Sequence, residues 1–386
     1  MRILIALTYY RPHYSGLTIY TERLARALAR RGHKVTVLTS RFDPRLPQQE
    51  VRHGVNIIRP WVLMRLSKGV IMPTLPLWAW KLVRQADVVN AHVPQLDAAP
   101  ISLISRIQGK PVVLTYHCDL RLPSGLIHAL ANRGSHMANW VSARAANLIV
   151  TNTRDYAENS FFLKHYLPKV RPIFPPVELA NPTQADIDAF RQKYNLLPGQ
   201  RIVGMAARLA TEKGVEFLVE AFPTVLEKHP QARVLFVGQY TGVIGEDKYA
   251  QKLSPLIQAM DDHWSFLGIL PPEELAAFYR LAEVTVLPSL NSTESFGMVQ
   301  VESMISGTPV VASDLPGVRQ PIRMTGMGCI VPPADVAQLA QAIISVLDEP
   351  ERYHNDAAEI ARRFAPDTIA AEYEAIFEEL LGKRRS

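Results

Sequence analysis

Residues 284–313 read VTVLPSLNSTESFGMVQVESMISGTPVVAS and contain the clearest structural signal of the chain. Residues 284–287 form an apolar, β-branched run that predicts a buried strand, and residues 310–312 predict another. Between them, a polar loop over residues 289–297 leads into a helix. A strand, a loop at its carboxyl end and a helix form the unit of a parallel α/β sheet, and ligands of such sheets bind beyond the carboxyl ends of the strands.

The same alternation continues on both sides of this stretch. Residues 167–182 are rich in proline and predict a linker. The sequence therefore predicts an N-terminal α/β domain over residues 1–175, a second over 176–366 and a C-terminal helical segment over 367–386. Further strands are expected over residues 2–7, 35–38, 55–58, 88–91, 112–116, 148–151, 202–206, 234–237 and 265–267.

Length and composition exclude several classes of protein. The chain has 386 residues, of which 48% are hydrophobic and 20% charged, so a disordered protein is excluded and two domains with sizeable cores are expected. The apolar run 69–80 is too short to span a bilayer, and the first residues predict a strand rather than a signal peptide. Cys118 and Cys329 are the only cysteines, which argues against a disulfide scaffold or a structural zinc site and favours the cytoplasm.

Charge is distributed unevenly along the chain. Residues 1–171 hold 24 Lys and Arg against 8 Asp and Glu, a balance of +16, whereas the remainder holds 18 against 28, a balance of −10. This asymmetry indicates that the first half meets something anionic. The alternative is that its arginines only keep one domain soluble.

Four charged residues form the pattern that carries chemistry. Glu294 and Glu302 are separated by about 10 Å if the intervening residues are largely helical, so that one can contact a sugar and the other a ribose. The N-terminus of this helix offers N–H groups to a phosphate. Arg208 and Lys213, which follow the strand 202–206, can hold one diphosphate from two sides. The structural alternatives are a capped helix with Glu302 in a structural pair, and a solvated loop for the two cations.

These patterns resemble those of the retaining GT-B glycosyltransferases of family 4, also described as glycosyl transferases group 1. The resemblance spans nearly the whole chain and is most specific in its second half. The matching segments are Pro12, Ser15-Gly16, residues 31–38, Thr115-Tyr-His117, Arg208, Lys213-Gly214, Glu294-Ser-Phe-Gly297, Glu302 and Gly307-Thr-Pro-Val310.

The resemblance implies an α/β protein with the GT-B fold, in which two Rossmann-like domains with parallel sheets face each other across a cleft and the last helix crosses back to the first domain. It implies a hexosyltransferase that takes a hexose from a UDP- or GDP-sugar and keeps the α configuration. In the proposed same-face route the leaving phosphate takes the proton of the acceptor. Neither a carboxylate base nor a metal or other cofactor is then required.

The resemblance also implies roles for individual residues. Arg208 and Lys213 would neutralise charge on the leaving diphosphate, and Glu294 would bind sugar hydroxyls. His117 would face the donor sugar from the first domain, the alternative being a buried structural histidine. These four form the predicted catalytic group, and the predicted donor-binding residues are Gly16, Ser295, Phe296, Gly297 and Glu302.

The chain departs from the family pattern in two places. Ser15-Gly16 stands where a Gly-Gly pair is usual, which puts the approach of this loop to the diphosphate in doubt. Gly238-Gln-Tyr240 replaces the frequent Gly-Asp/Glu-Gly, so no role is assigned there. The sequence does not identify the base, the sugar, the acceptor or the oligomeric state.

Aromatic and basic side chains of the first half suggest an acceptor at an anionic membrane surface. We expect a peripheral enzyme on the inner face of the plasma membrane that glycosylates a lipid or lipid-linked acceptor. The alternative is that the apolar residues pack a helix onto the sheet. The predicted membrane and acceptor residues are Trp61, Arg65, Lys68, Trp78, Trp80 and Lys81. A second amphipathic segment is predicted to comprise Leu126, Ile127, Leu130 and Met137 with Arg121 and Arg133.

Other functions compete with this interpretation. A nicotinamide dehydrogenase is disfavoured because no G-x-G-x-x-G follows the first strand. A GT-B sugar-nucleotide epimerase and a transferase with a soluble acceptor remain as alternatives. A non-catalytic carbohydrate binder or a nucleic-acid binder would use the basic half, but the four charged residues of the motif argue against both.

Overall fold

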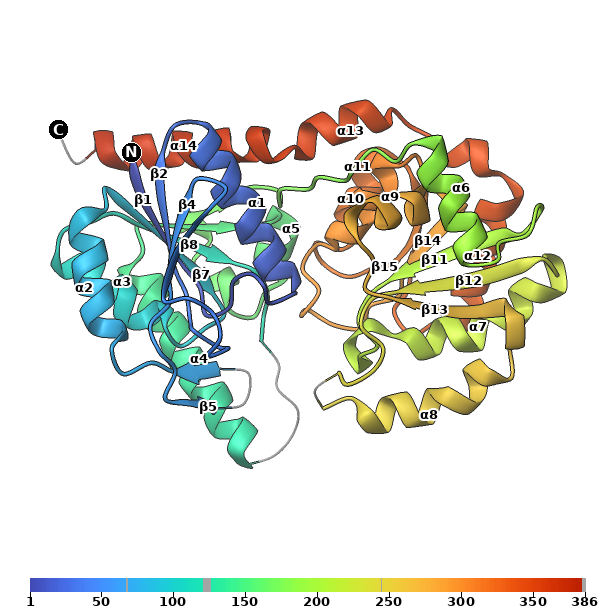
Figure 1. Cartoon of the computed structure of the whole chain (residues 1–386), viewed down its shortest axis with the longest axis horizontal. Helices are drawn as coiled ribbons and strands as arrows, with labels where there is room; N and C mark the ends of the chain where they lie inside the picture. The colour runs from blue at the N-terminus through green and yellow to red at the C-terminus, as the bar shows by residue number, and fades with distance from the viewer. Residues whose placement is uncertain (67–68, 121–125, 244, 384–386) are drawn as a thin grey trace. The chain divides into compact units, whose positions relative to one another are not determined.

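The computed structural model describes residues 1–66, 69–120, 126–243 and 245–383 (Figure 1). The chain divides into two compact units. The first unit comprises Met1–Val177 together with Phe364–Ser386, and the second comprises Glu178–Arg363.

The first unit is built around a sheet whose strands run in the order β10-β9-β8-β7-β1-β2-β4-β3. All neighbours in it are parallel except β3 and β4. Its strands are β1 (Arg2–Ala6), β2 (Lys34–Leu38), β3 (Gln49–Arg52), β4 (Val55–Ile58), β7 (Val88–Val93), β8 (Val112–Tyr116), β9 (Leu148–Thr151) and β10 (Val170–Pro172), with a separate hairpin of β5 (Met64–Leu66) and β6 (Gly69–Ile71). Its helices are α1 (Gly16–Arg30), α2 (Leu75–Gln85), α3 (Ala98–Ile107), α4 (Leu126–Ala145), α5 (Arg154–Asn159) and α14 (Pro366–Gly382), with 3-10 turns η1 (Leu163–His165) and η2 (Leu167–Lys169).

The second unit contains a fully parallel sheet in the order β13-β12-β11-β14-β15-β16. Its strands are β11 (Arg201–Ala206), β12 (Ala232–Val237), β13 (Trp264–Gly268), β14 (Val284–Leu287), β15 (Val310–Ser313) and β16 (Gly328–Val331). Its helices are α6 (Gln184–Lys193), α7 (Val215–Lys228), α8 (Asp247–Gln258), α9 (Pro272–Leu281), α10 (Met298–Ile305), α11 (Gln320–Thr325), α12 (Val336–Asp348) and α13 (Ala357–Phe364), with 3-10 turns η3 (Thr211–Lys213), η4 (Asp261–His263) and η5 (Pro350–Tyr353).

Both sheets have the strand order of a Rossmann-like fold. If the strands of the second sheet are numbered in chain order, they lie across the sheet as third, second, first, fourth, fifth and sixth. The direction of this order reverses between β11 and β14. The first unit reverses in the same way between β1 and β7. The prediction of an α/β protein with two Rossmann-like parallel sheets is therefore confirmed.

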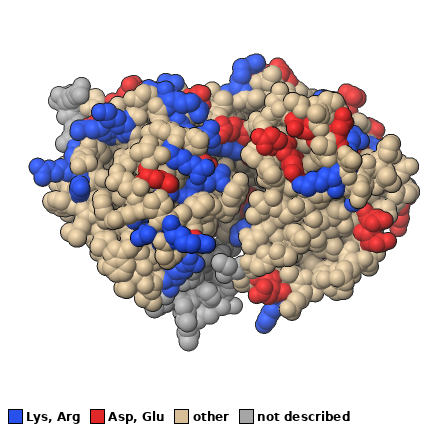
Figure 2. All heavy atoms as spheres, viewed as in Figure 1, with Lys and Arg blue, Asp and Glu red and all other residues tan. Residues whose placement is uncertain are grey.

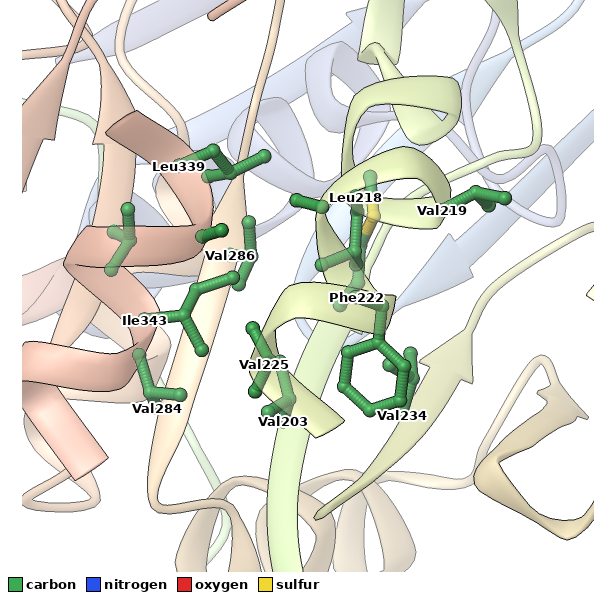
Figure 3. Packing of buried hydrophobic residues seen from close by; sticks show 14 of the residues in the cluster. Val203, Leu218, Val219, Phe222, Val225, Val234, Val284, Val286, Leu339 and Ile343 are labelled. Carbon is green, nitrogen blue, oxygen red and sulfur yellow. The ribbon is translucent and has the colours of Figure 1, made fainter. Parts of the chain in front are cut away.

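The second unit is held by apolar side chains that its strands and helices share. Phe222 and Val225 of α7, Ile343 of α12 and Val203 and Val284 of the sheet are all fully buried and converge in one cluster (Figure 3). Apolar residues of α7 recur three or four positions apart, which places them on the face that packs against the sheet. This core holds the carboxyl ends of β11 and β14 next to each other.

The last helix belongs to the first unit, where α14 packs on α1 (Figure 1). The buried hydroxyls of Tyr20 in α1 and Tyr373 in α14 are 2.8 Å apart, and that of Tyr373 lies 3.0 Å from Oγ1 of Thr115. At the solvent edge, Arg31 and His33 bind the carboxylate of Glu374. The helix thus reaches from the protein surface to the sheet.

One expectation for local structure was wrong, and one strand of the first unit without an apolar pattern was missed. The predicted linker over 167–182 begins too early, because Val170–Pro172 form an edge strand on β9 and the N–H of Ile173 donates to the carbonyl of Thr151. Proline fits there because an edge strand needs hydrogen bonds on one side only. Strand β3 was not predicted, because its residues QEVR are mostly exposed and have no apolar alternation.

Among the described residues, no helix combines the length and the apolar character needed to cross a membrane.

Candidate functional site

The main candidate site lies at the carboxyl edge of the second sheet, where the strand order reverses. The loops after β11 and β14 meet there, and the N–H of Leu290 donates to the carbonyl of Glu212 across 3.1 Å. Gly214 makes this approach possible. Its φ is +65°, and a Cβ on it would lie 2.1 Å from the carbonyl oxygen of Pro288. Ligands of open α/β sheets bind at such reversal points.

Lys213 and Glu294 meet at this edge. The Lys213 ammonium lies 2.6 Å from Oε2 of Glu294, and both side chains are about four-fifths buried, with exposed fractions of 20% and 17%. The cation comes from the end of η3 and the carboxylate from the loop before α10. The structure therefore brings two of the predicted catalytic residues into direct contact, although they are 81 positions apart.

Arg208 lies on the same loop as Lys213, but its side chain is more exposed to solvent. Its guanidinium donates to Oε1 of Glu212 across 2.9 Å, and its side chain is nearly half exposed. The loop itself is anchored by Glu246, whose carboxylate accepts hydrogen bonds from the N–H and the hydroxyl of Thr211. Sequence reasoning missed Glu212 and Glu246, which no motif singles out.

The N-terminus of α10 directly follows the loop after β14. Gly297 precedes the helix with φ +78° and offers no side-chain cap. The N–H of Gln300 donates to the carbonyl of Gly297 across 2.9 Å, and the two amides before it have no acceptor within the helix. They create a partial positive charge suited to an anion. Phe296 and Ser295 are buried, and the carbonyl of Phe296 is held by the side-chain amide of Gln300 at 2.8 Å. A Cβ at Gly297 would approach Cδ2 of Leu287 to 2.4 Å.

Glu302 has a different environment from Glu294. It lies within α10, its side chain is buried, and it accepts a hydrogen bond of 3.2 Å from the hydroxyl of Tyr279 in α9. This contact agrees with the structural alternative for Glu302, and its ribose-binding role stays a prediction.

Gly16 and His117 belong to the first unit. Gly16 is the first residue of α1, and the unusual Ser15 before it is the N-cap, whose hydroxyl accepts a hydrogen bond of 3.2 Å from the N–H of Thr18. The serine therefore has a local structural reason to stand there. His117 directly follows β8 and is 9% exposed, and burial lowers its pKa to about 3.

His117 is the end of a hydrogen-bonded chain that the sequence did not reveal. Its Nε2 lies 2.8 Å from Nδ1 of His92, and Nε2 of His92 lies 2.9 Å from Oδ1 of Asn90. The ring of Tyr20 meets that of His117 edge-on at 4.8 Å. Two polar residues two positions apart in the buried run VVNAHV were the available signal, because side chains in a strand alternate between its faces.

A second polar group marks the reversal point of the first sheet. The hydroxyl of Thr8, after β1, contacts both Gln95 and Asp97, which follow β7, at 2.9 Å each. Burial raises the pKa of Asp97 to about 6. These residues lie at the edge where ligands of such a sheet bind, and sequence reasoning missed them.

The predicted membrane residues differ in their exposure to solvent. Trp61 and Trp80 are about half exposed, whereas Trp78 packs against the core and carries Lys81 near its ring. Arg65 is exposed and donates to the carbonyl of Phe42. Lys68, Arg121 and the side chains of Leu126, Ile127 and Leu130 lie outside the described residues.

Helices α2, α3 and α4 pack side by side and share an unusual outer face. None of the three contains Asp or Glu. Their exposed apolar side chains lie beside exposed cations, and the guanidinium of Arg144 lies 4.8 Å from the ring of Trp140. We call this the acid-free face. Its exposed side chains are Leu77, Trp80, Lys81, Arg84, Leu103, Arg106, Ile107, Arg133, Met137, Trp140 and Arg144.

In the part of the chain that the structure describes, no group of three or more His, Cys, Asp or Glu side chains is arranged to hold a metal ion.

Solved structures identify the class of this fold. The chain superimposes on sucrose-phosphate synthase from Thermosynechococcus elongatus with a TM-score of 0.77, at 23% identity and over 99% of both chains. It also matches Anabaena HepE in complex with UDP-glucose, with a TM-score of 0.74 at 20% identity, over 99% of this chain and 100% of that one. At these identities the likeness shows the fold alone, which is GT-B.

Sequence comparison then gives the family. The model of Glycosyltransferase Family 4 matches residues 14–180, and that of Glycosyl transferases group 1 matches residues 186–364. D-inositol 3-phosphate glycosyltransferase of Acidothermus cellulolyticus is 29% identical over 394 residues, which cover 96% of this chain and 87% of the relative. The chain belongs to the GT4-type glycosyltransferases with a GT-B fold.

Proposed function

We propose that the protein is a retaining hexosyltransferase that uses a UDP- or GDP-sugar and glycosylates a lipid or lipid-linked acceptor at a membrane surface. The observation that carries the donor half of this proposal is the contact of Lys213 with Glu294 at the reversal point of the second sheet, beside the uncapped N-terminus of α10. The ammonium of Lys213, which can bind phosphate, and the carboxylate of Glu294, which can bind hydroxyls, are thus in direct hydrogen-bond contact. The match to HepE, which was solved with UDP-glucose, is compatible with such a donor.

In this proposal, protein groups stabilise the leaving diphosphate. The ammonium of Lys213 and the guanidinium of Arg208 balance the charge that develops as the bond between the sugar carbon and the phosphate oxygen breaks. Amides at the start of α10 add partial positive charge, and Glu294 binds sugar hydroxyls. No metal or other cofactor is required for this chemistry.

The α configuration is retained if the acceptor attacks the sugar carbon on the same face from which the leaving group departs. The acceptor oxygen forms its bond to the sugar carbon as the phosphate leaves, and the acceptor proton passes to the leaving phosphate oxygen. Glu302 and Gly16 would contact the donor without taking part in proton transfer, and His117 would contact its sugar. The resemblance to the family supplies these roles.

The acid-free face supports a membrane-bound acceptor. Figure 2 shows Lys and Arg side chains gathered on the visible part of the first unit and Asp and Glu side chains on the second. The acid-free face exposes five cations, Lys81, Arg84, Arg106, Arg133 and Arg144, together with apolar side chains such as Leu77, which is 73% exposed. Each basic residue near an anionic bilayer contributes about 1 kcal/mol, and apolar side chains insert at the headgroup boundary.

Donor binding is tested by thermal unfolding in the presence of a panel of nucleotide sugars. A true donor at one hundred times its Kd stabilises the protein by about 2.7 kcal/mol. The anomeric proton of the product, followed by NMR before it can equilibrate, then reports retention. A panel in which no nucleotide sugar shifts the transition would contradict the proposal.

Membrane binding is tested by sedimentation with vesicles. We expect the protein to sediment with anionic vesicles at low salt and to remain in solution with zwitterionic ones. Trp80→Asp should weaken binding, whereas Leu256→Asp, at an exposed leucine of the second unit, is the matched control and should not. Failure of the unmodified protein to bind anionic vesicles would remove the membrane part and leave a soluble acceptor.

A further inference from the structure

Two buried histidines of the first unit share one hydrogen bond. His92 lies in β7 and His117 directly follows β8, and their ring centroids are 5.0 Å apart with the ring planes inclined by 25°. Nδ1 of His92 and Nε2 of His117 are separated by 2.8 Å, so one nitrogen carries the proton and the other accepts it. The direction of this bond determines which nitrogen of His117 is left to meet a substrate.

Asn90 determines the direction. Its side-chain nitrogen lies 3.1 Å from the carbonyl oxygen of Val113 and 2.8 Å from Oγ1 of Thr115. A carbonyl only accepts, so the amide nitrogen must face Val113 and the amide oxygen must face His92. Because that oxygen also only accepts, Nε2 of His92 carries the proton at this 2.9 Å contact.

The assignment then passes to His117. A neutral imidazole has one N–H, so Nδ1 of His92 is an acceptor and Nε2 of His117 must donate to it. Thr21 Oγ1 lies 3.2 Å from the same Nδ1 and 2.9 Å from the carbonyl of Leu17. Its single proton goes to one of these acceptors, and neither choice requires a proton on His92 Nδ1. Nδ1 of His117 is therefore unprotonated, and within the described residues it has no hydrogen-bond partner.

We propose that Asn90 and His92 are positioning residues that hold His117 in the tautomer protonated at Nε2, so that its Nδ1 accepts a hydrogen bond from a hydroxyl of the transferred sugar. This inference rests on the proposed function for the identity of the ligand. It selects a sugar with a hydroxyl donor at that position. A carboxylate or carbonyl oxygen there would face a lone pair and be repelled.

The surroundings keep this arrangement neutral. Burial lowers the pKa of His117 to about 3, and burial together with the neighbouring His117 lowers the pKa of His92 well below its ordinary value. The groups that face the pair from α1 and α14 are Tyr20, whose ring contacts both histidines, and Tyr373, which bonds to the hydroxyl of Tyr20. Burial raises the pKa of both tyrosines, so they stay protonated as well.

NMR of the full chain labelled with ¹⁵N-histidine tests the tautomer without any ligand. In unmodified protein, we expect His117 to be protonated at Nε2 and unprotonated at Nδ1 from about pH 6 to about pH 9. In Asn90→Leu, Nε2 of His92 loses its acceptor, so the proton of His92 should move to Nδ1 and that of His117 to its own Nδ1. His92→Gln is the matched control, because its amide oxygen can still accept from His117. Thermal unfolding shows whether each variant is folded.

Calorimetric binding of donor analogues tests the hydroxyl contact. When each sugar hydroxyl is replaced in turn by fluorine, which cannot donate, one position should lose about tenfold in affinity for the unmodified protein and for His92→Gln. That loss should disappear in Asn90→Leu, where Nδ1 of His117 has become a donor.

The outcomes separate the two proposals. A proton on Nδ1 of His117 in the unmodified protein, or an unchanged tautomer in a folded Asn90→Leu variant, overturns the positioning role whatever the ligand. Correct tautomers with equal affinity for all fluorinated donors overturn the hydroxyl contact. If no nucleotide sugar binds at all, the proposed function fails while the tautomer assignment stands.

Discussion

Replacing Gly214 by alanine tests the close approach of the two loops that form the donor site. At φ +65° an alanine costs about 1–2 kcal/mol relative to glycine. The added methyl group would also lie 2.1 Å from the carbonyl oxygen of Pro288, which is backbone and cannot rotate away. Relief of such overpacking costs about 1–3 kcal/mol, so Gly214→Ala should lose about 2–5 kcal/mol in total.

Gly326→Ala is the matched control in the same unit. Its φ is +69°, and a Cβ there has no atom within 4 Å, so only the conformational cost of about 1–2 kcal/mol applies. We therefore expect a difference of about 2 kcal/mol between the two variants. Urea unfolding followed by circular dichroism measures it, with both variants analysed at one temperature and by the same linear extrapolation.

The same variant should weaken donor binding. Moving the loops apart separates Lys213 from Glu294, and loss of one charge-assisted contact to a diphosphate corresponds to about tenfold or more in Kd. Calorimetry with the nucleotide sugar found in the thermal screen measures this loss, and Gly326→Ala should bind normally. If the two glycine variants agree within about 0.5 kcal/mol in stability and bind the donor equally, the reasoning about this approach is refuted.

Three further predictions concern single side chains. Lys213→Ala and Glu294→Ala should each lower turnover by about a hundredfold or more with the fold retained, whereas Lys193→Ala, which removes an exposed ion pair of the same unit, should leave initial rates within about twofold. For Asp97, a folded pKa of about 6 lies above the unfolded value of 3.8, so its stabilisation is complete below about pH 4 and is lost as the pH rises through about 6. Asp97→Asn should therefore be more stable than the unmodified protein at pH 7.5 by up to about 3 kcal/mol and similar to it near pH 4, and equal urea midpoints at pH 7.5 would contradict the pKa shift. Tyr373→Phe should lose about 1–3 kcal/mol of unfolding free energy, because it removes the hydroxyl that Tyr20 contacts and leaves the hydroxyl of Thr115 with Asn90 alone; an unchanged melting temperature would show that α14 is not held by these bonds.

The parallel strands could be predicted because each is a short apolar run next to a helix with apolar residues on one face. Run and helix together specify a parallel sheet, and the runs at β7, β8, β14 and β15 lie where the sequence indicates. Strand β16 was not predicted, because Gly-Cys-Ile-Val is too short to be distinguished from a turn. Edge strand β10 was hidden by the prolines on either side of it.

The site was predictable residue by residue but not as an arrangement. The family pattern selects Lys213 and Glu294 separately, whereas their contact depends on β11 lying beside β14, which only the sheet order shows. The pair His92 and Asn90 matches no motif. Its role becomes clear only from the neighbouring strand β8, because the carbonyl of Val113 accepts a hydrogen bond from the Asn90 amide and so fixes its orientation.

The chain leaves the first unit and returns to it at one point. Val177 is the last residue before the second unit and Phe364 the first one after it, and the N–H of Val177 donates to the carbonyl of Phe364 across 2.8 Å. The second unit is thus an insertion whose two ends are already adjacent. A linker of a few residues between these two positions would join the first unit into one continuous chain that keeps both histidines and the acid-free face but lacks the donor loops. If that chain folds, its binding to lipid vesicles can be measured apart from sugar transfer.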